Sequence, residues 1–456
     1  MIGPARTAAL TALRAVEDGR IDLPTALVQS RERLQDDRDR ALAADIIVGT
    51  LRWRAALDHV IVHIAGRSLD RLDPEVVTIL RLSLYQILHL TRVPASAVVD
   101  DAVDLVRGVR KPSATGFVNA VLRGALRQKN RLPLPARPDD QADRAGAVAY
   151  LSVSHSHPAW LIERWLDRYG FAATERWVEF NNVAPALSLR ANRLRISRDD
   201  LARQLAEVEV ETRPADWSED GLIVTAGNPL RLPRQGLFVV QDEASQLVPL
   251  TVDVRPGARV LDLCASPGGK ATAMAGLMAD RGLLVACDVR PRRTRLLRDA
   301  VHDSGALSIR IVQVPRSGGL PFGEVFERVL VDAPCSGLGT LRRDPDIKWR
   351  RLPDDLPAFA EAQRDLLDRA AAAVAPGGRL VYATCSSEPE ENDEVVRAFL
   401  AHHDEFTLVP AIEHAPSLTP LIDADGFLRT LPFEHGLEAF FAAAMVRRDR
   451  VSLTIS

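Results

Sequence analysis

Val260-Leu-Asp-Leu-Cys-Ala-Ser-Pro-Gly-Gly-Lys270 is the stretch of sequence that decides the fold. It begins with a short apolar run typical of a buried β-strand, and Ser-Pro-Gly-Gly then predicts a tight turn. A helical pattern follows over residues 270–279. A strand, a glycine turn and a helix in this order begin a βαβ unit, whose turn lies where such sheets bind ligands. The stretch therefore predicts an α/β domain with a binding site at its first turn.

The same alternation of strands and helices continues towards the C-terminus. Short apolar runs occupy 283–288, 308–312, 328–332 and 378–384, and helical patterns occupy 291–303 and 358–374. Strands of this kind, separated by helices, form parallel sheets that are covered on both faces. We therefore expect a Rossmann-like, doubly wound, mostly parallel α/β domain over residues 237–450.

The N-terminal part has a different sequence pattern, because its apolar residues recur at helical spacing and strand signals are nearly absent. The helical segments are 5–17, 39–57, 73–88, 95–106 and 115–126. These predict an all-α bundle over residues 1–130. Residues 131–236 are predicted to be a linker and a small α+β subdomain: a Pro-rich polar stretch over 131–145, helices at 160–169 and 198–206, and strands at 186–192 and 222–225.

Composition limits the classes of protein and of partner. With 456 residues and a net charge of −3, the chain has several domains but cannot attract nucleic acid by bulk positive charge. It contains no apolar stretch of the roughly 20 residues that a membrane helix needs, nor a signal peptide. Four cysteines without a C-x-x-C pair indicate neither a disulfide framework nor a zinc site. We expect a cytoplasmic monomer without a metal or a membrane partner.

The glycine turn and the end of the next strand form a candidate cofactor site. Asp288 closes the second strand about 20 residues after the turn, where an acidic side chain can accept both hydroxyls of a ribose. The helix that begins behind the turn favours an anionic group such as a carboxylate. The G-x-G-x-x-G pattern of dinucleotide-binding proteins is missing. These features indicate a nucleoside-type cofactor.

Two cysteines and an aspartate follow the next two strands. Asp332 and Cys335 come after the fourth strand, and Cys385 comes after the fifth, so all three should meet at the edge that holds the cofactor. Carbon 5 of cytosine becomes nucleophilic when a thiolate adds to C6, and a second group then assists elimination. A neighbouring carboxyl group that hydrogen-bonds the ring at N3 lowers the barrier further. The residues alone leave open which thiol attacks.

These motifs resemble the Sun (Fmu/RsmB) family of small-subunit (16S) ribosomal RNA cytosine-5 methyltransferases. The matching stretches are Cys264–Lys270, Asp332–Gly337, Arg343–Trp349, Thr384–Asn392, Gly236–Ser245 and Glu438–Phe441, and three N-terminal stretches, Leu80–Gln86, Val93–Ala97 and Phe117–Arg123, are similar to a NusB-type RNA-binding bundle. The resemblance implies that the cofactor is S-adenosyl-L-methionine, that Cys385 is the nucleophile and that Cys335 assists product release. The cofactor contacts it implies are Cys264, Ala265, Ser266, Pro267, Gly268, Gly269, Lys270, Asp288 and Asp332.

One position departs from the family pattern. After the third strand the family has an acidic residue that contacts the adenine amino group, but this chain has Val314 there. Valine cannot accept a hydrogen bond, and the loss of about 1 kcal/mol would weaken cofactor binding several-fold without abolishing it. Ser266 in place of alanine and Ala271 in place of threonine are smaller departures.

A basic cluster beside the Pro-Cys motif is the candidate RNA-binding site. Arg342, Arg343 and Lys348 lie there, with Arg350 and Arg351 close behind. Several cations in one short segment favour collective contact with phosphates, and a cytosine must leave its stack before a thiol can reach C6.

Three functions are therefore considered. The first is methylation of ribosomal RNA at cytosine C5. The second is the same chemistry on transfer RNA, against which only the NusB resemblance argues. The third is a non-catalytic RNA-binding or assembly factor with a degenerate cofactor pocket, for which Val314 is the only support.

Overall fold

The computed structural model describes residues 3–140, 143–233, 236–412 and 416–449. The chain folds into two compact units. Unit 1 comprises residues 1–184 and 341–351, and unit 2 comprises 185–340 and 352–456. The short segment 341–351 follows the predicted Pro-Cys motif in sequence, yet it folds with the N-terminal helices.

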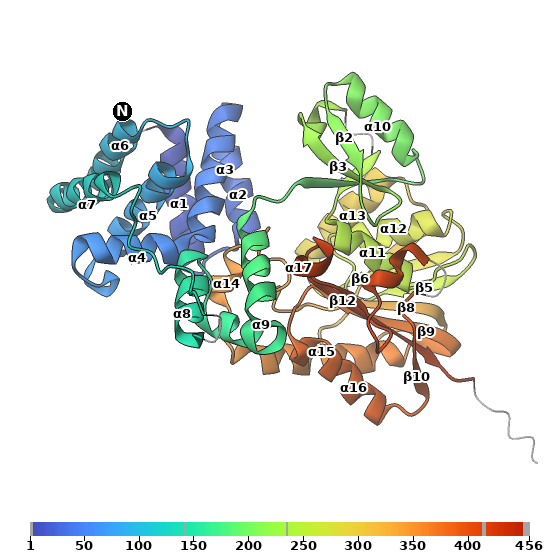
Figure 1. Cartoon of the computed structure of the whole chain (residues 1–456). Coiled ribbons are helices and arrows are strands. Elements are labelled where there is room, and N and C mark those ends of the chain that lie inside the picture. Colours follow the sequence, from blue (N-terminus) through green and yellow to red (C-terminus); the bar gives the residue numbers. More distant parts are fainter. Residues whose placement is uncertain (1–2, 141–142, 234–235, 413–415, 450–456) are drawn as a thin grey trace, which may run out of the picture. The chain divides into compact units, whose positions relative to one another are not determined.

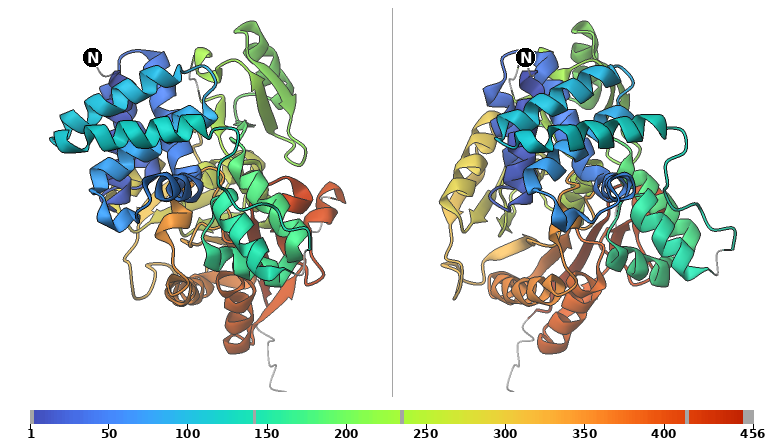
Figure 2. Two further views of the ribbon diagram at one scale, coloured as in Figure 1. Left: turned by 60° about the vertical axis from the view of Figure 1, so that its left-hand side comes forward. Right: turned by 90° about the vertical axis from the view of Figure 1, so that its left-hand side faces the viewer.

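Unit 1 is all-α among its described residues (Figure 1), which agrees with the all-α bundle predicted for residues 1–130 and extends beyond it to residue 184 and to the segment 341–351. The N-terminal helices, blue to cyan, pack against one another in both views of Figure 2 and share one apolar core. The helices are α1 (Pro4–Glu17), α2 (Leu23–Arg33), α3 (Asp37–Arg52), α4 (Arg54–Ala65), α5 (Pro74–His89), α6 (Ala95–Gly108), α7 (Thr115–Arg127), α8 (Arg144–Ala149), α9 (Ala159–Asn182) and, from the second segment, α14 (Ile347–Arg350).

Two helix boundaries differ from the sequence-based expectation. The helix predicted over 39–57 is two helices, because Trp53 leaves the helical conformation (φ −102°, ψ 14°) and stacks its ring on His89 with 4.7 Å between the ring centroids. Helix α9 extends past the predicted end at residue 169, across a kink at Gly170, whose φ of 74° suits glycine. Hydrophobic spacing predicts helices well but does not locate such local breaks.

Unit 2 begins with a small antiparallel sheet in the order β2-β3-β1-β4, on which helix α10 (Arg198–Glu207) packs. Its strands are β1 (Leu187–Ala191), β2 (Glu211–Pro214), β3 (Gly221–Ala226) and β4 (Phe238–Val240). Alternation of apolar residues predicts β1 and β3, whereas β2 has no buried residue and gives no such signal. This is the expected α+β subdomain.

The larger sheet of unit 2 has the order β10-β12-β9-β8-β5-β6-β7, and β11 pairs with β12. Strands β5 to β9 are parallel, and β12 joins β9 in antiparallel fashion. The strands are β5 (Arg259–Asp262), β6 (Leu283–Asp288), β7 (Ile309–Gln313), β8 (Phe326–Asp332), β9 (Val374–Thr384), β10 (Phe406–Val409), β11 (Leu428–Thr430) and β12 (Phe440–Arg447). The five parallel strands are those expected from the sequence.

Helices cover both faces of this sheet, which confirms the doubly wound, Rossmann-like architecture (Figure 1). One face carries α11 (Glu243–Thr251), α12 (Gly269–Leu277) and α13 (Pro291–Ser304), and the other carries α15 (Asp355–Ala371) and α16 (Asp393–His402). A short α17 (Pro432–His435) precedes β12. No described helix is both long and apolar enough to cross a membrane.

Candidate active site

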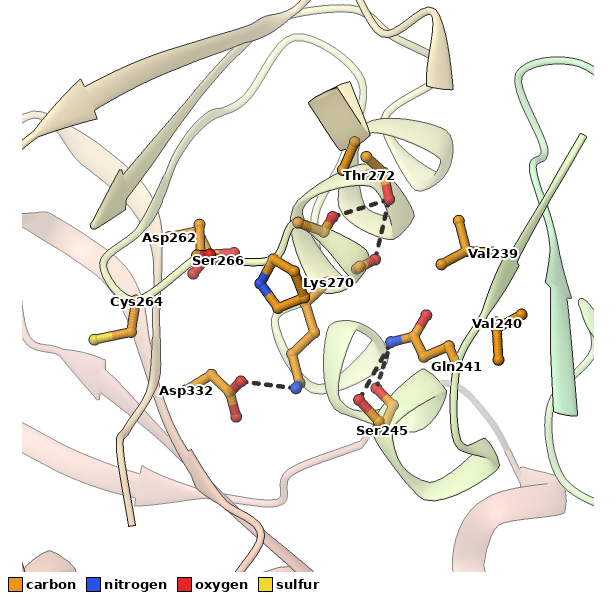
Figure 3. A pocket seen from close by; sticks show the side chains of 15 residues that line it. Val239, Val240, Gln241, Ser245, Asp262, Cys264, Ser266, Lys270, Thr272 and Asp332 are labelled. Carbon is orange, nitrogen blue, oxygen red and sulfur yellow. Dashed lines mark hydrogen bonds and ion pairs between the residues drawn. The ribbon is translucent and has the colours of Figure 1, made fainter. Parts of the chain in front are cut away.

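The loop between β5 and α12 forms one wall of a pocket at the carboxyl edge of the larger sheet (Figure 3). All seven residues from Cys264 to Lys270 line it. Gly268 has a φ of +113°, a conformation that L side chains rarely adopt, and it lies directly before the first turn of α12. The backbone N–H groups at the start of this helix can therefore approach a bound ligand closely.

Two carboxyl groups and one ammonium group lie in the same pocket. Lys270 Nζ donates to Asp332 Oδ2 at 2.7 Å, as Figure 3 shows. Burial alone would lower the pKa of Lys270, but the paired Asp332 and, to a smaller extent, the neighbouring Cys385 raise it, so the side chain stays cationic. Asp262, at the end of β5, is fully buried, and burial together with the charge of Asp332 raises its pKa to about 8. This shift favours the protonated form of Asp262 at neutral pH.

The two thiols predicted to share one site do so. Cys335 Sγ and Cys385 Sγ lie 3.2 Å apart, within hydrogen-bond distance. The hydrogen bond with Cys385, followed by burial, raises the pKa of the Cys335 thiol well above its ordinary value. Either sulfur can be the donor of this hydrogen bond. The raised pKa favours a protonated Cys335, and the cationic Lys270 interacts electrostatically with Cys385.

A buried glutamate fastens the two cysteine loops together. Glu391 is fully buried, and its Oε1 accepts from the Ser336 backbone N–H at 2.7 Å and from Gln363 Nε2 at 3.0 Å. Its Oε2 accepts from the hydroxyls of Ser336 and Ser386, each at 2.5 Å. Each serine directly follows one of the cysteines. The carboxylate therefore sets the separation of the two thiols without touching either.

Replacement of Glu391 by alanine should cost both stability and activity. Buried N–H and O–H donors would lose their acceptors, and the expected loss in the free energy of unfolding is about 3 kcal/mol. Urea denaturation measures this loss, and methyl transfer by the folded fraction should also fall because the thiols are no longer held together. Glu394→Ala, at an exposed position of α16, is the matched control and should change stability by less than about 0.5 kcal/mol. Equal stability of the two variants would contradict this role.

Asp288 and Val314 lie at the ends of β6 and β7. Asp288 is buried, its Oδ1 accepts from the Arg290 N–H at 3.0 Å, and it does not line the pocket described above. The Val314 side chain packs in the core under the sheet, and its backbone N–H donates to the Asp288 carbonyl at 3.2 Å. The predicted weakening of adenine binding by Val314 remains a prediction.

The predicted RNA-binding residues lie in the segment that folds with unit 1. Lys348 is only 1% exposed, and its Nζ donates to the Arg52 carbonyl at 2.9 Å. Burial and the nearby Arg52 lower its pKa well below the ordinary value. This burial argues against the predicted phosphate contact by Lys348, because the amine is enclosed in protein. Its sequence position among arginines could not reveal this burial.

The two arginines of the predicted cluster have different surroundings. Arg342 donates to the carbonyls of Val183 and Ala184, and its guanidinium lies 4.3 Å from the centroid of the Phe180 ring. These contacts stabilise the C-terminal end of α9. Arg343 is half-buried. Phosphate contact by Arg343 remains a prediction.

Several residues of the site have no role that the sequence assigns, among them Asp262, Glu391 and Gln241. Asp262 lies within the stretch Val260–Lys270, and Glu391 lies within Thr384–Asn392. Asp262 closes its strand just as Asp288 does, which was an available signal. Gln241 also lines the pocket, yet only its place in the Gly236–Ser245 stretch pointed to it. Among the residues that the structure describes, no group of three or more His, Cys, Asp or Glu side chains could hold a metal ion.

A doubly wound sheet with a glycine-turn pocket and a thiol pair at its edge defines a Rossmann-like methyltransferase class, and comparisons with known proteins identify the family. The model for 16S rRNA methyltransferase RsmB/F matches residues 249–446, the NusB family matches 3–127, and a ferredoxin-like domain of RsmF/B-like methyltransferases matches 157–231. The chain belongs to the RsmB/F family of methyltransferases. It is therefore an enzyme.

Relatives are similar over almost their whole length. The probable ribosomal RNA small subunit methyltransferase B of Bacillus subtilis is 34% identical in sequence. The aligned region covers 90% of this chain and 91% of the Bacillus protein. A putative methyltransferase of Mycobacterium tuberculosis is 37% identical in sequence, and the aligned region covers 98% of this chain and 97% of the mycobacterial protein. The crystal structure of PH0851 superposes on this structure with a TM-score of 0.80 and a sequence identity of 28%. The superposition covers 98% of this chain and 99% of the PH0851 chain.

Proposed function

We propose that this protein methylates carbon 5 of a cytosine in small-subunit ribosomal RNA, with S-adenosyl-L-methionine as the methyl donor. The observation that supports this proposal most strongly is the pair of thiols 3.2 Å apart, on loops that follow the strands beside the glycine-turn pocket. The names of the relatives, which include small-subunit ribosomal RNA methyltransferases, support the substrate class.

The pocket fits this cofactor by its chemistry. The loop 264–270 offers close backbone approach and the N-terminus of α12, which suits a carboxylate. Asp332 lies beside the loop with its Oδ2 held by Lys270. Asp288, which is buried at the end of β6 and does not line the pocket, is the residue that the family resemblance implies for the ribose. S-adenosyl-L-methionine, when bound, supplies an electrophilic methyl group. The residues of the chain must then make carbon 5 of the base nucleophilic.

Cys385 performs that activation. Its thiolate adds to C6, a carbon–sulfur bond forms, and the electron pair of the C5–C6 double bond becomes available at C5. Lys270 stabilises the thiolate electrostatically before the attack, and the S–H of Cys335 can donate to its sulfur. Addition of the thiolate delocalises negative charge onto N3, which takes a proton from water and returns it to water when the C5–C6 double bond re-forms. Asp332, whose Oδ2 is held by Lys270, has a second oxygen that can accept a hydrogen bond from this N3–H.

Cys335 assists the last step. When the proton on C5 leaves to water, its bonding pair re-forms the C5–C6 double bond, and the C6–S bond breaks with its electrons returning to Cys385. A thiolate is a better leaving group when a neighbouring donor stabilises it. The Cys335 thiol, kept protonated by its surroundings, is that donor.

Isothermal titration calorimetry tests whether the pocket is functional. The full chain is titrated with S-adenosylhomocysteine, which cannot be turned over, and with NAD as a control ligand. We expect saturable binding of the first ligand only. Absence of binding at high micromolar concentrations would favour a non-catalytic assembly factor, and methyl transfer to transfer RNA but not to small-subunit RNA would correct the substrate.

A further inference from the structure

Arg190 is a buried cation of the small sheet whose side chain contacts residues that line the cofactor pocket. It lies in β1, is only 4% exposed, and is not one of the residues that line the glycine-turn pocket. Burial lowers its pKa to about 10, so the guanidinium is still charged at neutral pH. A buried charge is costly unless its hydrogen bonds are satisfied, so its partners indicate what it does.

The partners of Arg190 belong to the cofactor site. Its Nη2 donates to the Gly269 carbonyl at 2.9 Å and to Thr272 Oγ1 at 3.0 Å. Thr272 Oγ1 in turn donates to the Gly268 carbonyl at 3.0 Å. Gly268 and Gly269 are the two residues of the loop with the greatest conformational freedom. One guanidinium therefore restrains the part of the loop that would otherwise lose the most entropy when a ligand binds.

Arg190 also orients the side chain of Gln241, which lines the same pocket. Its Nε donates to Gln241 Oε1 at 2.7 Å. Because a guanidinium has donors only, the amide oxygen must face Arg190, and the amide nitrogen must point the other way. That nitrogen lies 3.2 Å from Ser245 Oγ, also a pocket residue (Figure 3). The amide can therefore offer a donor, and not an acceptor, on the Ser245 side.

We propose that Arg190 is a positioning residue that preorganises the glycine loop and the Gln241 amide for the adenosyl cofactor. It acts on affinity for the cofactor and not on the chemical step, since it touches neither thiol nor Asp332. The inference rests on the proposed function, because it presumes that the pocket binds S-adenosyl-L-methionine. It assigns to the small sheet a role in cofactor binding.

The test compares Arg190→Met with a variant that removes buried hydrogen bonds just after β1. Asn192→Ala is suitable, because Asn192 Nδ2 donates to the carbonyls of Gly236 and Ser304, both outside the glycine loop. Calorimetry of the full-length variants with S-adenosylhomocysteine gives Kd, and steady-state assays with RNA give KM for the cofactor and kcat. Thermal denaturation reports stability separately.

For Arg190→Met we expect Kd and the cofactor KM to rise about tenfold or more, the scale of one lost charged hydrogen bond. The value of kcat at saturating cofactor and the RNA affinity should change by less than about twofold. Asn192→Ala should lower the melting temperature but leave Kd unchanged. Arg190→Lys, which keeps the charge but cannot bridge Gln241 and Gly269, should lie between wild type and Arg190→Met.

An unchanged Kd for Arg190→Met, or an equal rise for Asn192→Ala, would overturn the proposal. If Arg190→Met does not fold, Arg190→Lys is judged by the same criterion. If the proposed function itself is incorrect, the result differs, because the wild-type protein would then bind no S-adenosylhomocysteine.

Discussion

Cys385→Ala is expected to abolish methyl transfer and to form no covalent complex with RNA. Without its thiolate nothing adds to C6, and C5 of cytosine is then too weak a nucleophile to react. Loss of the nucleophile in enzymes that use covalent catalysis lowers kcat on the order of 10⁴-fold or more. The measurement is incorporation of labelled methyl groups into small-subunit RNA, together with denaturing gel electrophoresis of the protein–RNA mixture.

The control for this prediction is another cysteine of the same domain. Cys287 is fully buried in β6 and belongs to the core under the sheet, away from the thiol pair. Cys287→Ala should retain methyl transfer within a few-fold and lose only the stability expected for a small buried side chain. Binding of S-adenosylhomocysteine by Cys385→Ala should equal that of the wild type, which shows that the pocket is intact. Substantial turnover by Cys385→Ala would refute the assignment of the nucleophile.

Cys335→Ala should show the opposite behaviour, because it can form the covalent complex but cannot resolve it efficiently. The thiolate leaving from C6 would lack the S–H donor 3.2 Å away. Contributions of such proton donors are typically 10²- to 10⁴-fold, so we expect turnover to fall by roughly 10²-fold or more. A protein–RNA complex that survives denaturation should accumulate in proportion to the enzyme.

The double variant Cys335→Ala/Cys385→Ala provides the control, since it should form no such complex. If instead Cys335→Ala were the variant that formed no complex and Cys385→Ala accumulated one, the roles of the two cysteines would be exchanged. The proposed reaction class would survive that outcome, but Cys335 would then be the nucleophile and Cys385 the residue that assists release.

The sequence predicts the architecture of this protein well where local signals are strong. The parallel strands are continuous apolar runs, and the glycine turn after β5 is unmistakable, so the larger sheet and its site could be predicted. Strand β12 is different, because its antiparallel insertion beside β9 depends on pairing between residues about 60 positions apart, such as Phe441 with Thr384. Helix α2 was missed because only Leu23, Ala26 and Ser30 are buried on it.

The candidate site shows the same limit. The juxtaposition of Cys335 and Cys385 follows from two strand ends and could be predicted. The burial of Lys348 could not, since it depends on the carbonyl of Arg52, nearly 300 positions earlier in the chain. Glu391 connects two loops through serines that look unremarkable in sequence. Residues whose roles depend on distant partners are those that the sequence alone leaves unassigned.

The central claim is methylation at cytosine C5, and tritium release tests it most directly. Small-subunit RNA is prepared with tritium at C5 of its cytosines and incubated with the full-length protein and S-adenosyl-L-methionine carrying a ¹⁴C-labelled methyl group. Since methylation at C5 replaces the hydrogen there, we predict one tritium released to water for each methyl group incorporated, and neither from Cys385→Ala. Methyl incorporation without tritium release would place the methyl group on another atom and contradict the claim.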